Sequence, residues 1–339
     1  MMKKYLLALS VLGGFSGLAS AQSSVTLYGV ADVALESIKG ATTLTRVSSG
    51  QQQGSRWGLR GNEDLGGGLK AVFQLESGFN LDTGASGQGG LLFGRQAYVG
   101  LEGQWGGVRL GRQYSPMDDI AGVVGTKTYD VLSVVPIIGN GDYNRVNNAI
   151  TYLSPSLNGL TFQAQYSMGE ERVATDASED FGKQYSAYAL YVRGPWTAGL
   201  AYMSVIDAVG TTAGKQGKNA VLLAGSYDFG TVKLSAYYDE EDKAAEKLSV
   251  MGLAAAFKFG ATTVSVGAAK ARNVNGSAAA LSDDATLFTL QASHDLSKRT
   301  ALYANVTTVS NDEASALGFN SPVAGSSSNG VQFGVRHRF

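Results

Sequence analysis

The fold is decided most clearly by the last nine residues, VQFGVRHRF (residues 331–339). Their odd-numbered positions carry Val, Phe, Val, His and Phe, whereas the even-numbered positions carry Gln, Gly, Arg and Arg. Successive side chains of a β-strand point to opposite faces, so this stretch predicts a strand with one apolar face and one polar face. Phe339 closes the apolar face at the end of the chain.

The same alternation with a period of two recurs throughout the chain upstream of this strand. In the segment 69–76, Leu69, Phe73 and Leu75 alternate with Lys70 and Gln74. Sixteen such segments can be distinguished, and they predict an all-β protein. Their approximate centres are Val30, Leu59, Phe73, Tyr98, Leu110, Tyr152, Phe162, Tyr188, Leu200, Leu223, Leu234, Leu253, Val266, Leu290, Leu302 and Phe333.

The connections between these segments are short at one end and long at the other. The short ones are 64–68, 105–107, 194–195, 229–230 and 296–298, and the long ones are 39–54, 114–147, 169–183, 206–218, 239–247, 273–283 and 311–329. All five prolines fall in connections, where the missing N–H removes no ladder hydrogen bond. Short turns at one rim and long loops at the other are typical of a β-barrel that spans an outer membrane.

A soluble β-sandwich would also show alternating strands, so alternation alone leaves both architectures open. The number of segments, their even count and the asymmetry of the loops favour the barrel. In lipid every backbone polar group needs an internal partner, and a closed sheet provides one for each. A sheet of sixteen strands closes around a water-filled lumen.

Composition excludes several other classes of protein. No segment after the first 21 residues approaches 18 consecutive apolar residues, so a helical membrane protein is excluded. The 27 basic and 28 acidic residues are balanced, which argues against a nucleic-acid partner. The chain has no cysteine, hence neither disulfides nor thiolate metal ligands.

The first residues have the pattern of a secretory signal peptide. Lys3 and Lys4 are followed by an uncharged apolar stretch and then by Ala19-Ser20-Ala21, a small-x-small cleavage pattern. An N-terminal membrane anchor is the alternative, but glycines and serines interrupt the apolar stretch. We therefore expect a signal peptide over 1–21 and a single barrel domain over 22–339. Removing the two lysines leaves 25 basic and 28 acidic residues in the mature chain.

Several stretches resemble the general trimeric porins of Gram-negative bacteria. They are SVTLYG (24–29), SRWGLRGNEDLGGG (55–68), FGRQAYVGL (93–101), VRLGRQ (108–113) and the terminal Phe339. The resemblance covers the whole mature chain and is most specific between Ser24 and Gln113. It implies a sixteen-stranded antiparallel barrel in the cell outer membrane, with Phe339 as its assembly signal. Implied partners are the other subunits of a homotrimer, outer-membrane lipid and lipopolysaccharide, the barrel-assembly machinery, and the small hydrophilic solutes and ions that pass through.

The resemblance further implies that the third long loop, 114–147, folds into the barrel and narrows it. A cluster of arginines faces this constriction in the family, and Arg56 or Arg60, with Arg95, match its motif positions best. Side-chain parity places Arg56, Arg60 and Lys70 toward the lumen, and the loop is flanked by Arg95, Arg112 and Arg145. Arg95 and Arg112 share the parity of lipid-facing neighbours, so we expect them at strand ends or bulges. The loop offers acidic residues opposite the arginines, and we expect a weak anion preference to remain. These acidic residues are Asp118, Asp119, Asp130 and Asp142.

Enzymatic functions find little support in the sequence. His294 and His337 are the only histidines, and no nucleophile elbow, zinc-protease motif or phosphate-binding loop is present. We therefore expect no cofactor, no metal and no catalytic residue. The acidic run 239–242 lacks the spacing of a calcium-binding loop and is expected to be a solvated loop tip. A closed or plugged barrel that serves as an adhesin or an enzyme is the alternative to a diffusion channel.

Overall fold

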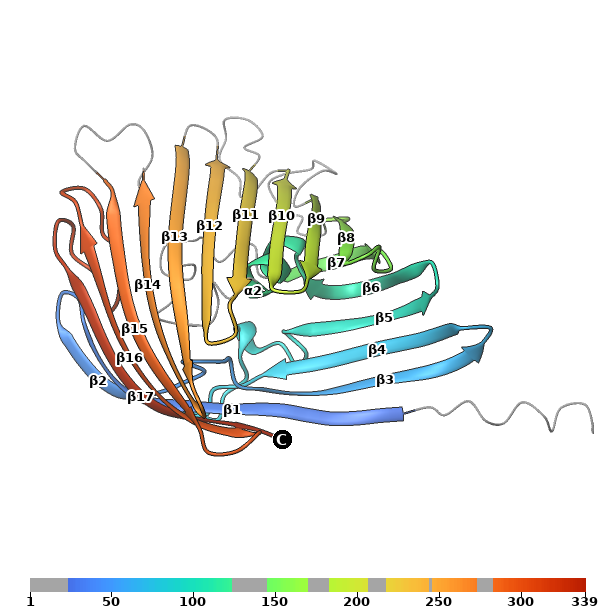
Figure 1. The fold of residues 1–339 in the computed structure, drawn as a ribbon, viewed down its shortest axis with the longest axis horizontal. Coiled ribbons are helices and arrows are strands. Elements are labelled where there is room, and N and C mark those ends of the chain that lie inside the picture. The colour runs from blue at the N-terminus through green and yellow to red at the C-terminus, as the bar shows by residue number, and fades with distance from the viewer. Residues whose placement is uncertain (1–23, 124–144, 170–182, 207–217, 244–245, 273–282) are drawn as a thin grey trace, which may run out of the picture.

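The computed structural model describes residues 24–123, 145–169, 183–206, 218–243, 246–272 and 283–339. All strands belong to one antiparallel sheet that curves around a lumen (Figure 1). The strands are β1 (Ser24–Lys39), β2 (Thr43–Ser49), β3 (Arg56–Gly66), β4 (Leu69–Gly78), β5 (Gln96–Gly103), β6 (Gly106–Tyr114), β7 (Arg145–Leu153), β8 (Leu160–Ser167), β9 (Gln184–Arg193), β10 (Trp196–Val205), β11 (Lys218–Asp228), β12 (Val232–Lys243), β13 (Glu246–Phe259), β14 (Thr262–Arg272), β15 (Ala285–Asp295), β16 (Thr300–Asn311) and β17 (Ser328–Arg338).

The sheet is closed because its first strand pairs with its last one. Val30–Lys39 of β1 pair with Arg338–Asn329 of β17. The opposite edge of β1 pairs with β3 along its first half and with β2 along its second half. β2 and β3 therefore lie end to end and together count as one strand of the barrel wall. The barrel thus has sixteen strands around its circumference, as predicted. All sixteen predicted centres lie within strands, whereas β2 falls in a segment that the sequence predicted to be a loop.

The connections alternate in length, as the sequence predicted. One rim carries tight turns such as 194–195, and the other carries the longer connections. The connection 79–95 is also long and contains η1 (Gln88–Gly90), although it was not among the predicted loops. The prediction for 239–242 was wrong: this run lies within β12, where Asp239 and Glu241 are buried. Its alternate carboxylates point to opposite faces, and Lys218 Nζ, on the neighbouring strand, lies 3.0 Å from Glu241 Oε2.

Side-chain exposure is inverted relative to a soluble sandwich. On β15, Phe288 and Leu290 are 53% and 45% exposed, whereas Thr289 and Gln291 are 1% and 3% exposed. The apolar parity therefore forms the outer surface and the polar parity faces the interior. A soluble protein would have to leave this whole apolar band in water, which is incompatible with a stable fold in that solvent. The outer face is built for lipid.

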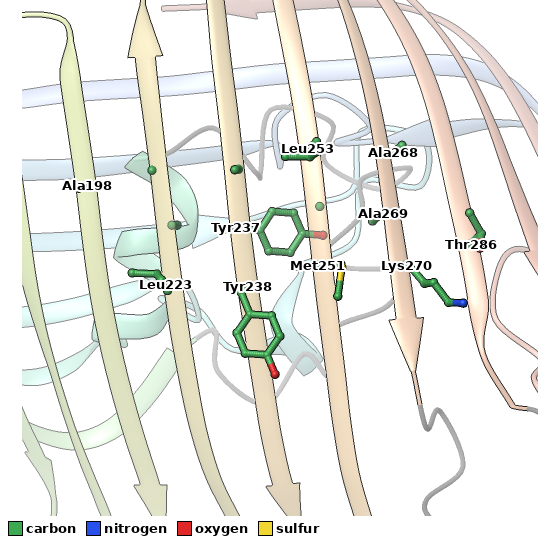
Figure 2. Close-up of a pocket in the computed structure, with 14 residues that line it drawn as sticks. Ala198, Leu223, Tyr237, Tyr238, Met251, Leu253, Ala268, Ala269, Lys270 and Thr286 are labelled. Carbon is green, nitrogen blue, oxygen red and sulfur yellow. The ribbon is translucent and has the colours of Figure 1, made fainter.

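The aromatic side chains of the outer face are placed as expected for a protein in a bilayer. Exposed aromatic side chains gather along the rim of short turns, where membrane proteins place amphipathic rings at the lipid–water interface. They include Trp105, Trp196, Phe229, Phe259 and Phe339. A hollow of about 710 Å³ lies across the outer face of β11 to β14, between Leu223, Tyr238, Met251 and Leu253 (Figure 2).

Candidate pore constriction

The inner face of β3 and its neighbours carries a cluster of arginines around one glutamate. Glu76, on β4, is 3% exposed. Its Oε1 accepts a hydrogen bond from Arg95 Nε at 2.8 Å, and its Oε2 lies 3.6 Å from Arg56 Nε. The carboxylate of Glu76 therefore contacts two guanidinium groups and holds them side by side.

Tyr114 extends this cluster across the lumen wall to β7. Its hydroxyl oxygen accepts hydrogen bonds from Arg95 Nη2 at 2.7 Å and from Arg145 Nη2 at 3.2 Å. The Arg145 guanidinium also lies over the Tyr114 ring, 4.8 Å from its centroid. A ring face attracts a cation without neutralising its charge. Tyr114 thus holds Arg145 beside Arg95 at the point where the chain leaves β6.

Two more arginines lie on tyrosine rings along the same wall. Arg60 lies 5.2 Å from the centroid of Tyr28, and Arg109 lies 4.9 Å from that of Tyr98. Gln74 connects the two tyrosines, because it donates to the Tyr28 oxygen and accepts from the Tyr98 hydroxyl. The hydroxyl of Tyr28 in turn donates to Glu76 at 2.9 Å. These hydrogen bonds therefore fix the two rings, and each ring face contacts one guanidinium group.

Local sequence features make these positions possible. A Cβ at Gly58 would lie 2.7 Å from the Tyr28 hydroxyl oxygen, so the glycine leaves room for the tyrosine to cross β3. The register of β6 and β7 shifts between Gly111 and Gln113, which turns Arg112 away from its regular place. Arg112 Nε donates to the Gly94 carbonyl at 2.8 Å. A bulge re-aims side chains in this way.

Helix α2 (Pro116–Val123) follows directly after Tyr114 and lies inside the barrel (Figure 1). Ser115 is its N-cap, with Oγ accepting the Asp118 N–H at 3.1 Å, and Pro116 occupies the first helical position. α2 packs against β8 to β11, with Met117 and Ile120 fully buried. No helix in the described part of the chain has the length and apolar character needed to cross a bilayer.

The approach of α2 to the wall depends on small residues there. A Cβ at Gly199 would lie 2.8 Å from Ile120 Cδ1, and Ala201 on the same strand is fully buried. The first residues of the loop 114–147 therefore turn inward and cover the wall next to the arginines. Its apolar stretch 131–138 lies outside the described residues.

The structure brings together four of the six basic residues singled out from the sequence, namely Arg56, Arg60, Arg95 and Arg145. As expected, Arg95 precedes a strand and Arg112 lies at a bulge; Arg112 contacts the same loop segment as Arg95 through Gly94. Lys70 lies elsewhere: it is exposed near the 67–68 turn, opposite Asp64 and Glu102.

The acidic residues are only partly described. Asp118 and Asp119 lie in the first turn of α2, where the positive end of the helix dipole stabilises carboxylates. Asp118 is 9% exposed. Asp130 and Asp142 lie outside the described residues.

Sequence reasoning missed Glu76, Arg109 and the tyrosines beneath the arginines. Arg109 has the inward parity of β6, opposite Gly100, and this pattern could have identified it. Its Nη2 lies 2.8 Å from Glu102 Oε1. Five arginines, at 56, 60, 95, 109 and 145, therefore line this wall, and three of them, at 56, 95 and 109, pair with Glu76 or Glu102. Among the described residues, no group of three or more His, Cys, Asp or Glu could hold a metal ion.

A closed β-barrel with a lipid-compatible outer band, a polar interior, a charged stretch of wall and a helix folded inside it defines the class of outer-membrane channel proteins.

Comparisons with known proteins agree with this class. The sequence profile of the Gram-negative porin family matches residues 8–314. The outer membrane porin protein 32 of Delftia acidovorans is 35% identical over the full length of both chains, and an outer membrane porin protein of Bordetella pertussis is 33% identical over the same extent. The solved anion-selective porin from Comamonas acidovorans superimposes with a TM-score of 0.82 at 30% identity, over 94% of this chain and 100% of that one.

The chain belongs to the Gram-negative porin family. It is accordingly a protein of the cell outer membrane, and its barrel allows small hydrophilic solutes and ions to diffuse across that membrane.

Proposed function

We propose that this porin passes anions better than cations and that the arginine cluster on β3 to β7 is its charge filter. The supporting observation is the gathering of five arginines on the lumen wall, where Arg56 and Arg95 contact Glu76, Arg109 contacts Glu102, and Arg60 and Arg145 lie over tyrosine rings. Charges at a narrow, poorly screened place in a pore select ions by sign, whatever the net charge of the whole protein. The solved relative from Comamonas acidovorans is itself described as anion-selective.

Asp118 and Asp119 enter this proposal as a moderating influence. They lie on α2, which covers the wall formed by β8 to β11. As negative charges inside the same lumen, they reduce the anion preference without reversing it. Asp130 and Asp142 are assigned the same role.

The experiment is a reversal-potential measurement on the purified protein in a planar bilayer under a salt gradient. We expect stepwise ohmic conductance increments and a reversal potential of the sign that anion preference gives. A cation-type reversal potential would reject the charge filter. If folded protein gave no conductance steps, this would instead favour the alternative of a plugged barrel that serves as an adhesin or an enzyme. We propose no catalytic activity for this protein.

The proposal includes processing and assembly. We infer cleavage after Ala21, and N-terminal sequencing of envelope material should therefore begin at Gln22. We also infer a homotrimer, delivered by the barrel-assembly machinery with Phe339 as the signal and surrounded by outer-membrane lipid and lipopolysaccharide. Chemical crosslinking in intact envelopes should yield a trimer band; monomers alone would contradict this.

A further inference from the structure

Strands β2 and β3 lie end to end beside β1, and the turn between them enters the lumen. Ser49 of β2 pairs with Val33 of β1, and Arg56 of β3 pairs with Val30. Six residues, 50–55, therefore lie opposite only two residues of β1. We call residues 50–55 the inner turn. Gln51 and Gln52 in this turn are 4% and 7% exposed.

The inner turn is wound around the carboxylate of Asp32, which is 0% exposed. Oδ1 of Asp32 accepts the N–H groups of Gln51 at 3.0 Å and Gln52 at 3.3 Å, and Oδ2 accepts that of Gln53 at 2.9 Å. The hydroxyl of Tyr303, on β16, donates to Oδ1 at 2.7 Å. Four donors converge on one carboxylate, and three of them are backbone groups of the turn.

The backbone of Asp32 holds the end of the same turn. Its N–H donates to Ser55 Oγ at 3.1 Å, and its carbonyl accepts the Gly50 N–H at 2.8 Å. Asp32 thus fixes the first, middle and last residues of the inner turn. Because an ionised carboxylate only accepts hydrogen bonds, all four donors suit the charged form.

The far side of the inner turn contacts the arginine cluster. Arg56 Nη1 donates to the Gly54 carbonyl at 3.1 Å. A Cβ at Gly54 would lie 3.0 Å from Arg95 Nη1, so the turn backbone lies directly against that guanidinium. The two arginines that share Glu76 therefore lie between Glu76 and a turn that Asp32 holds in place.

We propose that Asp32 is a positioning residue for ion selectivity: through the inner turn it fixes Arg56 and Arg95 in the lumen. This inference rests on the arginine cluster being the charge filter. It assigns a function to a carboxylate that would otherwise count as an unfavourable negative charge in an anion pathway.

The sign of the effect separates positioning from plain electrostatics. Asp32→Asn removes a negative charge from the lumen wall, so electrostatics alone would raise the anion preference. The carboxamide also turns one acceptor into a donor that faces other donors, which releases part of the turn. Positioning therefore predicts the opposite result, a lower anion-to-cation permeability ratio.

The experiment compares reversal potentials of the full-length protein in planar bilayers with potassium chloride gradients. Asp32→Asn is expected to lower the permeability ratio about twofold or more, as expected for coupled neighbours. Glu36→Gln is the matched control: it removes the same charge from the same face of β1, where Glu36 is 2% exposed and binds Arg46 and Ser48 of β2. It should leave the ratio unchanged or raise it.

A double-variant test shows whether the effect passes through the arginines. In an Arg95→Ala background, Asp32→Asn should lower the ratio much less than it does in the wild type. An equal drop in both backgrounds, or a rise with Asp32→Asn alone, overturns the proposal. Should Asp32→Asn fail to fold, Tyr303→Phe removes one of the four donors and keeps the charge. A smaller drop then supports positioning, and an unchanged ratio overturns it.

These outcomes remain distinct from failure of the charge filter itself. A wild-type channel without anion preference rejects the filter. An anion-selective wild type whose permeability ratio does not fall in Asp32→Asn would instead leave the filter in place and reject the positioning role of Asp32 alone.

Discussion

Two walls of the same lumen use the same strand geometry in opposite ways. The wall from β3 to β7 presents guanidinium groups that rest on tyrosines and on Glu76. The wall from β8 to β11 presents Gly199, Ala201 and their neighbours, and α2 lies on them. Inward parity therefore does not mean polar: beneath Ile120 of α2, the inward positions of β10 are glycine and alanine. α2 therefore distinguishes a covered part of the wall from a charged part.

Removing Phe339 should have the largest effect, because both walls exist only if the barrel closes. Phe339 exchanges two backbone hydrogen bonds with Gly29, at 3.0 and 3.1 Å. Without it, the seam between β1 and β17 loses its last pair and the aromatic group at the rim, and two sheet edges are left less well paired. We expect a severe loss of folded protein in the outer membrane, measured by gel mobility of unheated samples. Replacement by Tyr should retain most of the yield; normal yield from the deletion would contradict the prediction.

Ile120→Asp should disrupt the packing of α2 on β10 and leave the arginine wall intact. Ile120 is 0% exposed against β10, and an unpaired carboxylate there costs on the order of several kcal/mol. Since α2 cannot keep this contact, we expect the loop to leave the wall and single-channel conductance to rise. Gly122→Asp places the same charge at an exposed position of the helix and is the control. Equal conductance in both variants and the wild type would show that the packing of α2 does not limit the pore.

Arg56→Ala and Arg60→Ala should weaken the charged side without opening the pore. We expect each to lower the anion-to-cation permeability ratio about twofold to fivefold, the effect of roughly 0.4–1 kcal/mol from a unit charge a few Å away in water. Reversal potentials in a salt gradient measure this. Arg193→Ala, at an exposed strand end, is the control for the loss of one positive charge. If neither lumen variant shifts toward cations, these residues are not the filter.

Glu76→Gln and Glu102→Gln should raise the anion preference of the charged wall, and they have the smallest expected effects. Glutamine keeps an acceptor for Arg95 and Tyr28 but removes the charge that the two arginines share. The permeability ratio should therefore rise, by less than about twofold, because part of the gain is lost if the arginines move apart. Glu102→Gln, near the short-turn rim and paired with Arg109, should produce a still smaller rise. A fall with Glu76→Gln would mean that the carboxylate mainly orders the cluster.

The strands could be predicted from the sequence because the period of two is a property of each segment alone. Parity was sufficient to place Arg56 and Arg60 inward, and the cost of a lipid-facing arginine placed Arg95 and Arg112 at irregular positions. The partners of these arginines were not predictable. Which residue lies opposite which depends on the register between strands, and a shift of one residue exchanges the two faces.

The two main errors have the same origin. The acidic run 239–242 and the segment 43–49 were both assigned to loops because polar residues dominate them. β12 has 12 residues, more than the roughly 9–11 that a tilted strand needs to cross the bilayer. Strands that extend beyond the hydrocarbon no longer need an apolar outer face, so hydropathy ceases to mark them while backbone pairing continues.

The seam at Phe339 has a consequence for the order of events during biogenesis. β17, which supplies the other side of this seam, is the last strand of the sheet along the chain. A chain that enters the periplasm from its N-terminus cannot close the barrel early, because one edge of β1 stays without its partner until β17 has arrived. The open form therefore persists for the full time of export, and protection of that edge by a chaperone or an assembly factor is a kinetic requirement of this topology.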